Sequence, residues 1–157
     1  MTQPRDIQGS DHNIWTGLTY DDALAARAWL STLGFTEGVL VADVDGTVQH
    51  SEMLWPEGGR VMVSSRDKAD DTFVTARGAG SVYVVVDDPD AVYARAQQLQ
   101  AVVVRPMEET DFGSRGFSVK DPEGNRWSFG TYAGEEQPPS SGPRRARAPA
   151  ADGRWPR

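Results

Sequence analysis

The chain has 157 residues, of which 38% are hydrophobic and 25% are charged, a composition that indicates one globular domain or two small fused modules. It contains no cysteine, which excludes disulfides, a cysteine nucleophile and thiolate metal sites and is compatible with the cytoplasm. No apolar run reaches the roughly eighteen residues of a membrane span, and residues 1–10 lack the apolar core of a secretory signal.

The formal net charge of −7 is unevenly distributed along the chain. Residues 135–157 contain five arginines and three acidic residues, a balance of +2, so residues 1–134 carry −9. An acidic body disfavours binding to nucleic acid and to anionic membranes and mildly favours a cationic ligand, although net charge acts first on solubility.

The first half of the chain predicts a strand, a helix and three more strands. Residues 14–20 form the first strand, and Asp21 or Asp22 can cap a helix whose apolar and small positions recur at helical spacing until Gly34 ends it. Strands are predicted at about 39–44, 47–54 and 60–64. The Pro- and Gly-containing turn 55–59 joins the last two into a hairpin.

The second half repeats this order. A strand at 81–86 leads into a helix that starts at Asp87-Asp88-Pro89, since proline suits an early helical position. A strand at 102–104 follows, and residues 117–120 and 126–129 form a hairpin around the turn 121–125.

An offset of 66 residues aligns the two halves. It places Asp21-Asp22 over Asp87-Asp88 and Pro56-Glu57-Gly58 over Pro122-Glu123-Gly124. A two-residue insertion at the start of the second helix then brings Ala26-Arg27-Ala28 over Ala94-Arg95-Ala96. Two copies indicate a duplicated, pseudo-twofold domain.

The expected organisation has three parts. Residues 1–11 form an N-terminal extension, and residues 12–132 form the domain, with halves at about 12–66 and 80–132. Residues 133–157 form a disordered tail rich in proline and arginine, because this segment has too little apolar surface to offset its ordering entropy.

The βαβββ order resembles the vicinal-oxygen-chelate superfamily of glyoxalases, bleomycin-resistance proteins and extradiol dioxygenases. The motifs that carry the resemblance are Tyr20-Asp21-Asp22-Ala23, Leu33-Gly34-Phe35 and the turn Asp121-Pro122-Glu123-Gly124-Asn125. It implies an α+β fold in which tandem βαβββ modules form a curled mixed sheet around a cavity, and a homodimer. Within the superfamily the chain is most similar to metal-free bleomycin-resistance-like proteins.

Strand parity assigns each side chain to a face of its sheet. We expect Ile14 and Leu18 to pack on the first helix, and Val82, Val84, Val86, Phe117, Val119, Trp127 and Phe129 on the second. The cavity side then receives Trp15, Gly17, Thr19, His50, Glu52, Leu54, Arg60, Met62, Ser81, Tyr83, Val85, Ser118, Lys120, Arg126 and Ser128.

The resemblance also locates the metal-ligand positions of the superfamily, on the first and last strand of each half. In this chain they are Trp15, Met62, Ser81 and Ser128, none of which is His, Asp or Glu. A hard or borderline divalent ion needs several imidazole or carboxylate donors. We therefore predict no metal and no cofactor.

The side chains in place of the ligands are aromatic and apolar. Trp15 and Tyr83 on facing strands, with Met62 nearby, suit a planar or amphipathic organic molecule; alternatively, Trp15 fills a closed core. Arg115 is a candidate for holding an anionic group at the cavity mouth, or a solvated loop residue. The predicted ligand-binding residues are Trp15, His50, Glu52, Met62, Tyr83, Arg115 and Ser118.

Three functions remain open from the sequence. The first is metal-independent small-molecule binding, including antibiotic sequestration. The second is a metal-independent isomerase or lyase with His50 and Glu52 as acid and base, since these residues lie two apart on one strand and point the same way. The third is a metal enzyme with ligands rebuilt around the same pair.

Overall fold

The computed structural model describes residues 14–135. The predicted N-terminal extension and nearly all of the predicted tail lie outside these residues. Within them, the order βαβββ occurs twice, as predicted. The longer of the two helices has 11 residues, and no helix in the described part has the length and apolarity of a membrane span.

The strands and helices have the following bounds. The first half consists of β1 (Thr16–Tyr20), α1 (Ala23–Leu33), β2 (Thr36–Ala42), β3 (Val48–Leu54) and β4 (Arg60–Ser65). The second half consists of β5 (Ser81–Val85), α2 (Pro89–Gln98), β6 (Val102–Glu109), β7 (Arg115–Lys120) and β8 (Arg126–Gly130).

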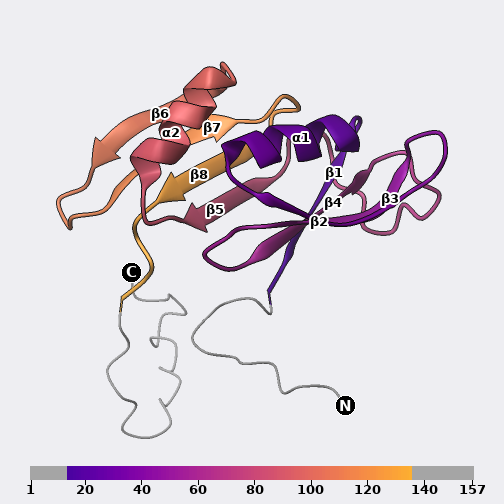
Figure 1. Ribbon diagram of the computed structural model, residues 1–157, viewed down its shortest axis with the longest axis horizontal. Helices are drawn as coiled ribbons and strands as arrows, with labels where there is room; N and C mark the ends of the chain where they lie inside the picture. Colours follow the sequence, from indigo (N-terminus) through magenta and orange to yellow (C-terminus); the bar gives the residue numbers. More distant parts are fainter. Residues whose placement is uncertain (1–13, 136–157) are drawn as a thin grey trace, which may run out of the picture.

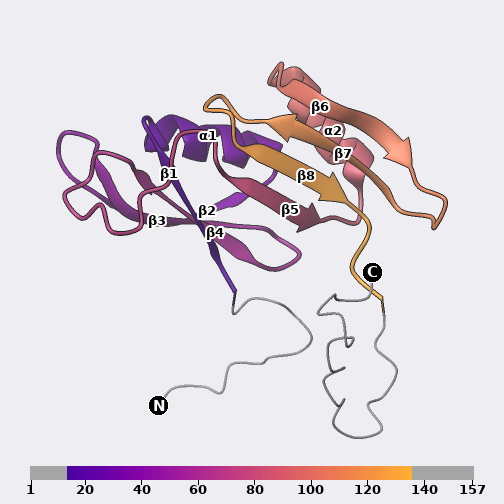
Figure 2. The same cartoon turned by 180° about the vertical axis from the view of Figure 1, so that it is seen from behind.

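Each half forms its own four-stranded mixed sheet. Sheet A has the order β1-β4-β3-β2, and sheet B has the order β5-β8-β7-β6. In both sheets the outer pair, β1 with β4 and β5 with β8, is parallel and the other pairs are antiparallel. Helices α1 and α2 contact each other and lie along one side of the molecule (Figures 1 and 2). The predicted α+β fold is confirmed, with the refinement that the two sheets are not closed on each other within the chain.

The helix boundaries follow from capping. The Asp22 side chain accepts a hydrogen bond from Ala25 N at 2.9 Å, and α1 ends at Gly34, whose φ of 129° is readily accessible only to glycine. Asp88 caps α2 in the same way through Ala91 N at 3.1 Å, and Pro89 takes its first position.

The predicted two-residue insertion in the second helix is wrong. The caps Asp22 and Asp88 are 66 residues apart, and so are Gly34 and Gln100, which follow the two helices and both have positive φ. Gln100 adopts a left-handed φ of 53° although it is not glycine. The residue type therefore gave no signal that position 100 ends its helix as Gly34 ends the first one. Arg27 therefore corresponds to Tyr93 rather than to Arg95.

The predicted faces of the strands hold with one exception. Leu18, Val84, Val86 and the aromatic and aliphatic side chains of the last hairpin are buried against the helices. Ile14 is the exception, because it precedes β1 and its side chain is 80% exposed instead of packing on α1.

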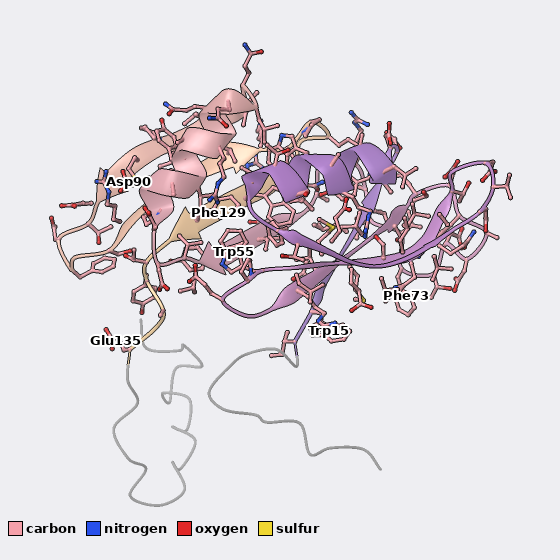
Figure 3. The ribbon with its side chains drawn as sticks, in the orientation of Figure 1. Trp15, Trp55, Phe73, Asp90, Phe129 and Glu135 are labelled. Carbon is pink, nitrogen blue, oxygen red and sulfur yellow. The ribbon has the colours of Figure 1, made fainter. Side chains whose placement is uncertain are left out.

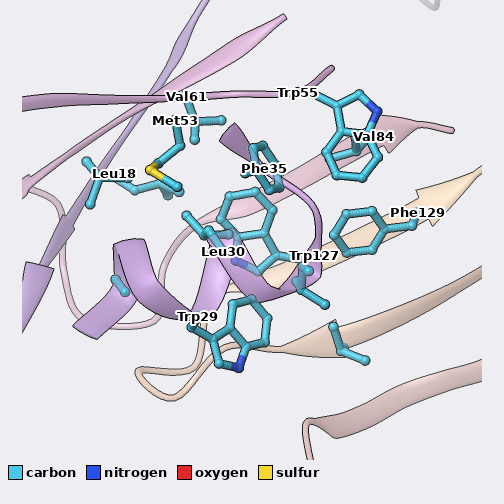
Figure 4. Close-up of a cluster of buried hydrophobic side chains, with 14 of the residues drawn as sticks. Leu18, Trp29, Leu30, Phe35, Met53, Trp55, Val61, Val84, Trp127 and Phe129 are labelled. Atoms are coloured by element: carbon cyan, nitrogen blue, oxygen red, sulfur yellow. The ribbon is translucent and has the colours of Figure 1, made fainter. Parts of the chain in front are cut away.

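Aromatic side chains join the cores of the two halves. The Phe35 ring lies 5.0 Å from the Trp55 ring and 5.6 Å from the Trp127 ring, both edge-to-face, and Trp55 lies 6.0 Å from Phe129 (Figure 4). Edge-to-face aromatic pairs are favourable beyond the area they bury. The two modules therefore share one core, although their sheets are separate.

A buried carboxylate at the second hairpin turn organises the boundary between the halves. One oxygen of Asp121 accepts hydrogen bonds from Tyr20 Oη at 2.7 Å, Asn125 Nδ2 at 3.0 Å and Trp127 Nε1 at 3.1 Å. The other accepts from the backbone N–H groups of Glu123 and Asn125, both at 3.0 Å. Burial, then the charge of Asp121, raises the pKa of the Tyr20 hydroxyl far above its usual range, so Tyr20 stays protonated and donates.

Each of the two repeated turns also binds the start of the helix in the other half. The Glu123 carboxylate accepts from the backbone N–H groups of Asp21 at 2.7 Å and Asp22 at 3.0 Å, just before α1. Glu57, its counterpart in the first half, accepts from the N–H of Asp87 at 3.1 Å, just before α2. This reciprocal contact explains why both Pro-Glu-Gly turns recur at the same offset.

We predict that Asp121→Ala lowers the free energy of unfolding by about 3 kcal/mol, because it leaves three buried side-chain donors without their acceptor. Urea unfolding followed by circular dichroism measures the change. The control Asp67→Ala removes an exposed carboxylate and should shift stability by no more than about 0.5 kcal/mol. Equal urea midpoints for Asp121→Ala and the unmodified protein would contradict this role for the carboxylate.

Candidate ligand-binding site

The face of sheet A that points away from α1 carries a linked set of polar and aromatic side chains. His50 and Glu52 come from β3, and Arg60 and Met62 come from the adjacent strand β4, where Glu52 pairs with Met62 in the register. Trp15 stands at the entry to β1, which pairs with β4. Alternation along the strands places Val61 and Met53 in the core, so their neighbours face outward.

Glu52 is the centre of this set. Its Oε1 lies 2.6 Å from Arg60 Nη1, and its Oε2 lies 3.1 Å from His50 Nε2. The bond from Arg60, and then that from His50, holds the pKa of the Glu52 carboxyl below its usual range. Glu52 is therefore an ionised, fixed acceptor, a poor proton carrier near neutral pH.

Arg60 connects the carboxylate to the indole. Its guanidinium carbon lies 4.7 Å from the centroid of the Trp15 ring, within the range of a cation–π contact. The Trp15 side chain remains 36% exposed, on the side of the sheet away from α1 (Figure 3). Within one chain this exposure disagrees with the closed-core interpretation of Trp15, and its ligand contact stays a prediction.

The corresponding face of sheet B has a different character. Tyr83 on β5 is half exposed and donates from Oη to the carbonyl of Tyr132 at 2.8 Å. A Cβ at Gly130 would lie 2.9 Å from Tyr83 Oη, so glycine there leaves room for the phenol. Ser118 and Ser128, paired across β7 and β8, share a hydrogen bond of 2.7 Å between their hydroxyls.

The structure thus divides the predicted site residues between two sheets. Trp15, His50, Glu52 and Met62 lie together on sheet A, whereas Tyr83 and Ser118 lie on sheet B. The two sheets share no strand pairing within the described chain, so Trp15 and Tyr83 belong to separate faces.

Arg115 joins neither group. Its guanidinium makes two hydrogen bonds to the Asp90 carboxylate, at 2.9 Å and 2.7 Å, and lies 3.7 Å from Glu109. Asp90 is in the first turn of α2, on the helix side of the molecule (Figure 3). The Arg115 guanidinium, which was predicted to bind an anionic group at the cavity mouth, is therefore already paired with a carboxylate. The sequence gave no signal of this ion pair.

Arg60 is the residue that sequence reasoning missed. Strand parity had placed it on the cavity side, but its contact with Trp15 depends on the register between β1 and β4. The parallel pairing of Thr16 with Val61 brings positions 15 and 60 side by side. An arginine two residues before Met62 on the same face was the available signal.

The donor set at the four superfamily positions does not fit a divalent metal. Trp15, Met62, Ser81 and Ser128 offer an indole, a thioether and two hydroxyls, one of which is bonded to Ser118. Among residues 14–135, no three His, Asp or Glu side chains are grouped so that they could hold a metal ion.

The comparisons with known proteins agree with the fold. TioX from Micromonospora sp. ML1 is similar in structure, with a TM-score of 0.62 and 28% identity over 74% of this chain and 95% of TioX. A bleomycin resistance determinant encoded on transposon Tn5 gives a TM-score of 0.57 at 13% identity, over 76% of this chain and 97% of its own.

A lactoylglutathione lyase from Agrobacterium tumefaciens gives a TM-score of 0.55 at 23% identity, over 74% of this chain and 90% of its own. These last two similarities show the fold alone. Among curated proteins, no sequence matches this chain. The family model of the Glyoxalase/Bleomycin resistance protein/Dioxygenase superfamily matches residues 9–129, and the chain belongs to that superfamily.

Proposed function

We propose that this protein binds a small aromatic or amphipathic molecule without a metal, and that its role in the cell is sequestration, for example of an antibiotic, in the cytoplasm. The observation that carries the proposal is the Trp15–Arg60–Glu52 set on sheet A. It occupies the part of the fold where the resemblance to superfamily enzymes puts metal ligands.

The chemistry of this set favours recognition over catalysis. The indole and the Met62 thioether offer polarisable surface to a planar ring. The Arg60–Glu52 ion pair fixes both side chains, so little rotamer freedom is lost when a ligand arrives. His50, which is hydrogen-bonded to the same carboxylate, adds a polar ring that a ligand can contact.

The division of the site between two sheets supports a homodimer. Within one chain, the Trp15 face and the Tyr83 face belong to sheets that are not closed on each other. A second copy that places its sheet B opposite this sheet A would bring Tyr83 and Ser118 to Trp15 and Met62 and enclose a cavity. We expect sedimentation equilibrium to give about twice the chain mass of 17.1 kDa, and a monomer at all concentrations would remove this part of the proposal.

Ligand binding is tested with Trp15→Ala. Isothermal titration against a panel of antibiotics and planar aromatic metabolites should find a saturable ligand whose affinity is unchanged by EDTA. We expect Trp15→Ala to weaken that affinity about tenfold, the loss expected for one stacking contact of about 1.4 kcal/mol.

The control is Leu24→Ala, which truncates an exposed apolar side chain on α1, on the other side of sheet A from Trp15. It should leave the affinity unchanged. A ligand that responds to EDTA, or one that Trp15→Ala binds as tightly as the unmodified protein, would rule out the proposed site.

The alternative function is a metal-independent isomerase or lyase, favoured by the 3.1 Å contact between His50 and Glu52. The lowered pKa of Glu52 restricts this alternative to His50 as the proton carrier, with Glu52 orienting the ring.

We predict that each ligand found is recovered unchanged after long incubation with the protein, as measured by mass spectrometry, and that His50→Ala retains most of the affinity. A chemically altered product whose formation stops in His50→Ala would replace the binding proposal by the enzymatic one.

A further inference from the structure

A cavity of about 550 Å³ lies at the far end of sheet B, apart from every residue of the sheet A set. Its walls are the β6–β7 turn, residues 112–114, and the segment that follows β8, residues 131–135. Its volume falls in the usual range for small-molecule sites. Figure 3 shows Glu135, at one edge of this cavity, well separated from Trp15.

Two aromatic rings form the apolar part of this cavity. Phe112 and Tyr132 meet edge-to-face with their centroids 5.8 Å apart. Phe112 is nevertheless 71% exposed and Tyr132 45% exposed. Neither ring is needed for the core, and large aromatic surface left in contact with water is characteristic of binding sites.

Hydrogen bonds hold both walls in place. Thr110 fixes the turn by donating from its N–H to the Ser114 carbonyl at 2.8 Å and by accepting at Oγ1 from the Ser114 N–H at 3.1 Å. On the other wall, Thr131 Oγ1 accepts from the Arg115 N–H at 3.0 Å, and the Tyr132 carbonyl accepts from Tyr83 Oη at 2.8 Å. The rings are therefore carried by a preformed backbone.

Among the described residues, the lining of the cavity contains a single charged side chain, the carboxylate of Glu135. Arg115, next to the lining residue Ser114, is bonded to Asp90 and lies near Glu109, so its charge is neutralised from the outside of the site. The π-faces of Phe112 and Tyr132 also attract cations.

We propose that this cavity, the Phe112–Tyr132 pocket, is a binding site for a planar organic cation. The aromatic rings take the flat face of the ligand, and the Glu135 carboxylate selects the positive charge. Ser114 and Thr131, which also line the pocket, contribute polar groups. Within one chain the site is distinct from the Trp15 surface, because none of the sheet A residues lines it.

The test uses two tricyclic probes of similar shape and different charge. At neutral pH 9-aminoacridine is a cation, whereas acridine is largely neutral. Fluorescence titration of the full chain should give saturable binding of 9-aminoacridine and an affinity for acridine at least about tenfold lower.

Variants then locate the bound probe. Phe112→Ala and Tyr132→Ala should each weaken 9-aminoacridine about tenfold; the second keeps the backbone carbonyl that Tyr83 holds. Glu135→Gln should largely abolish the preference for the cation over acridine. The controls Phe73→Ala and Glu37→Gln, an exposed aromatic and an exposed carboxylate elsewhere, should change neither affinity.

Three results would overturn the proposal. The first is equal affinity for the two probes in the unmodified protein. The second is unchanged binding in both Phe112→Ala and Tyr132→Ala, with circular dichroism showing that these variants are folded. The third is an affinity that falls as protein concentration rises, which would mean that a second copy covers the pocket.

Loss of 9-aminoacridine binding in Trp15→Ala would assign the probe to the sheet A site and likewise reject the pocket, whereas retained binding in this variant supports the pocket.

Discussion

The buried carboxylate of Asp121 is the contact on which the rest of the molecule depends. It ties Tyr20, at the end of β1, to the hairpin turn of the second half, while Glu123 in the same turn holds the start of α1. Because Glu57 makes the equivalent contact to the start of α2, each half fixes the other half's helix. The two helices are thereby held together on one side, and the opposite faces of both sheets are left available for ligands or for a second copy.

This arrangement also determines what one chain can do alone. The halves share an aromatic core through Phe35, Trp55, Trp127 and Phe129, so they pack back to back through the side that carries the helices. The faces of the two sheets that point away from the helices are therefore separate within one chain, and the candidate site residues are divided between a face with Trp15 and a face with Tyr83. A duplicated module with this packing needs a partner to enclose a cavity between unlike faces, which is the physical basis for proposing a dimer.

Local signals in the sequence were enough for the fold but not for the site. The helix ends were predicted correctly from the capping residues Asp22, Asp88 and Gly34. The alternation of side chains along the last strand correctly placed Trp127 and Phe129 in the core and Ser128 on the opposite face. Gln100, by contrast, adopts a left-handed φ without being glycine, so the alignment of the second helix went wrong. Two contacts at or near the site could not be predicted from residue spacing, because they join residues that are far apart in the sequence. They are the ion pair of Arg115 with Asp90 and the cation–π contact of Arg60 with Trp15. The Phe112–Tyr132 pocket was missed because it combines a turn with a segment that follows the last strand.

The electrostatic state of Glu52 links these observations to function. A general acid or base near neutral pH needs a pKa close to the working pH, whereas the bonds from Arg60 and His50 push the pKa of Glu52 the other way. The same bonds neutralise its charge and hold the guanidinium over the indole, which gives the surface shape and polarity before any ligand arrives. Where superfamily enzymes are expected to concentrate metal ligands, this chain has a preorganised aromatic and ion-paired surface. That difference is the basis for proposing that the site holds a small molecule rather than converting it.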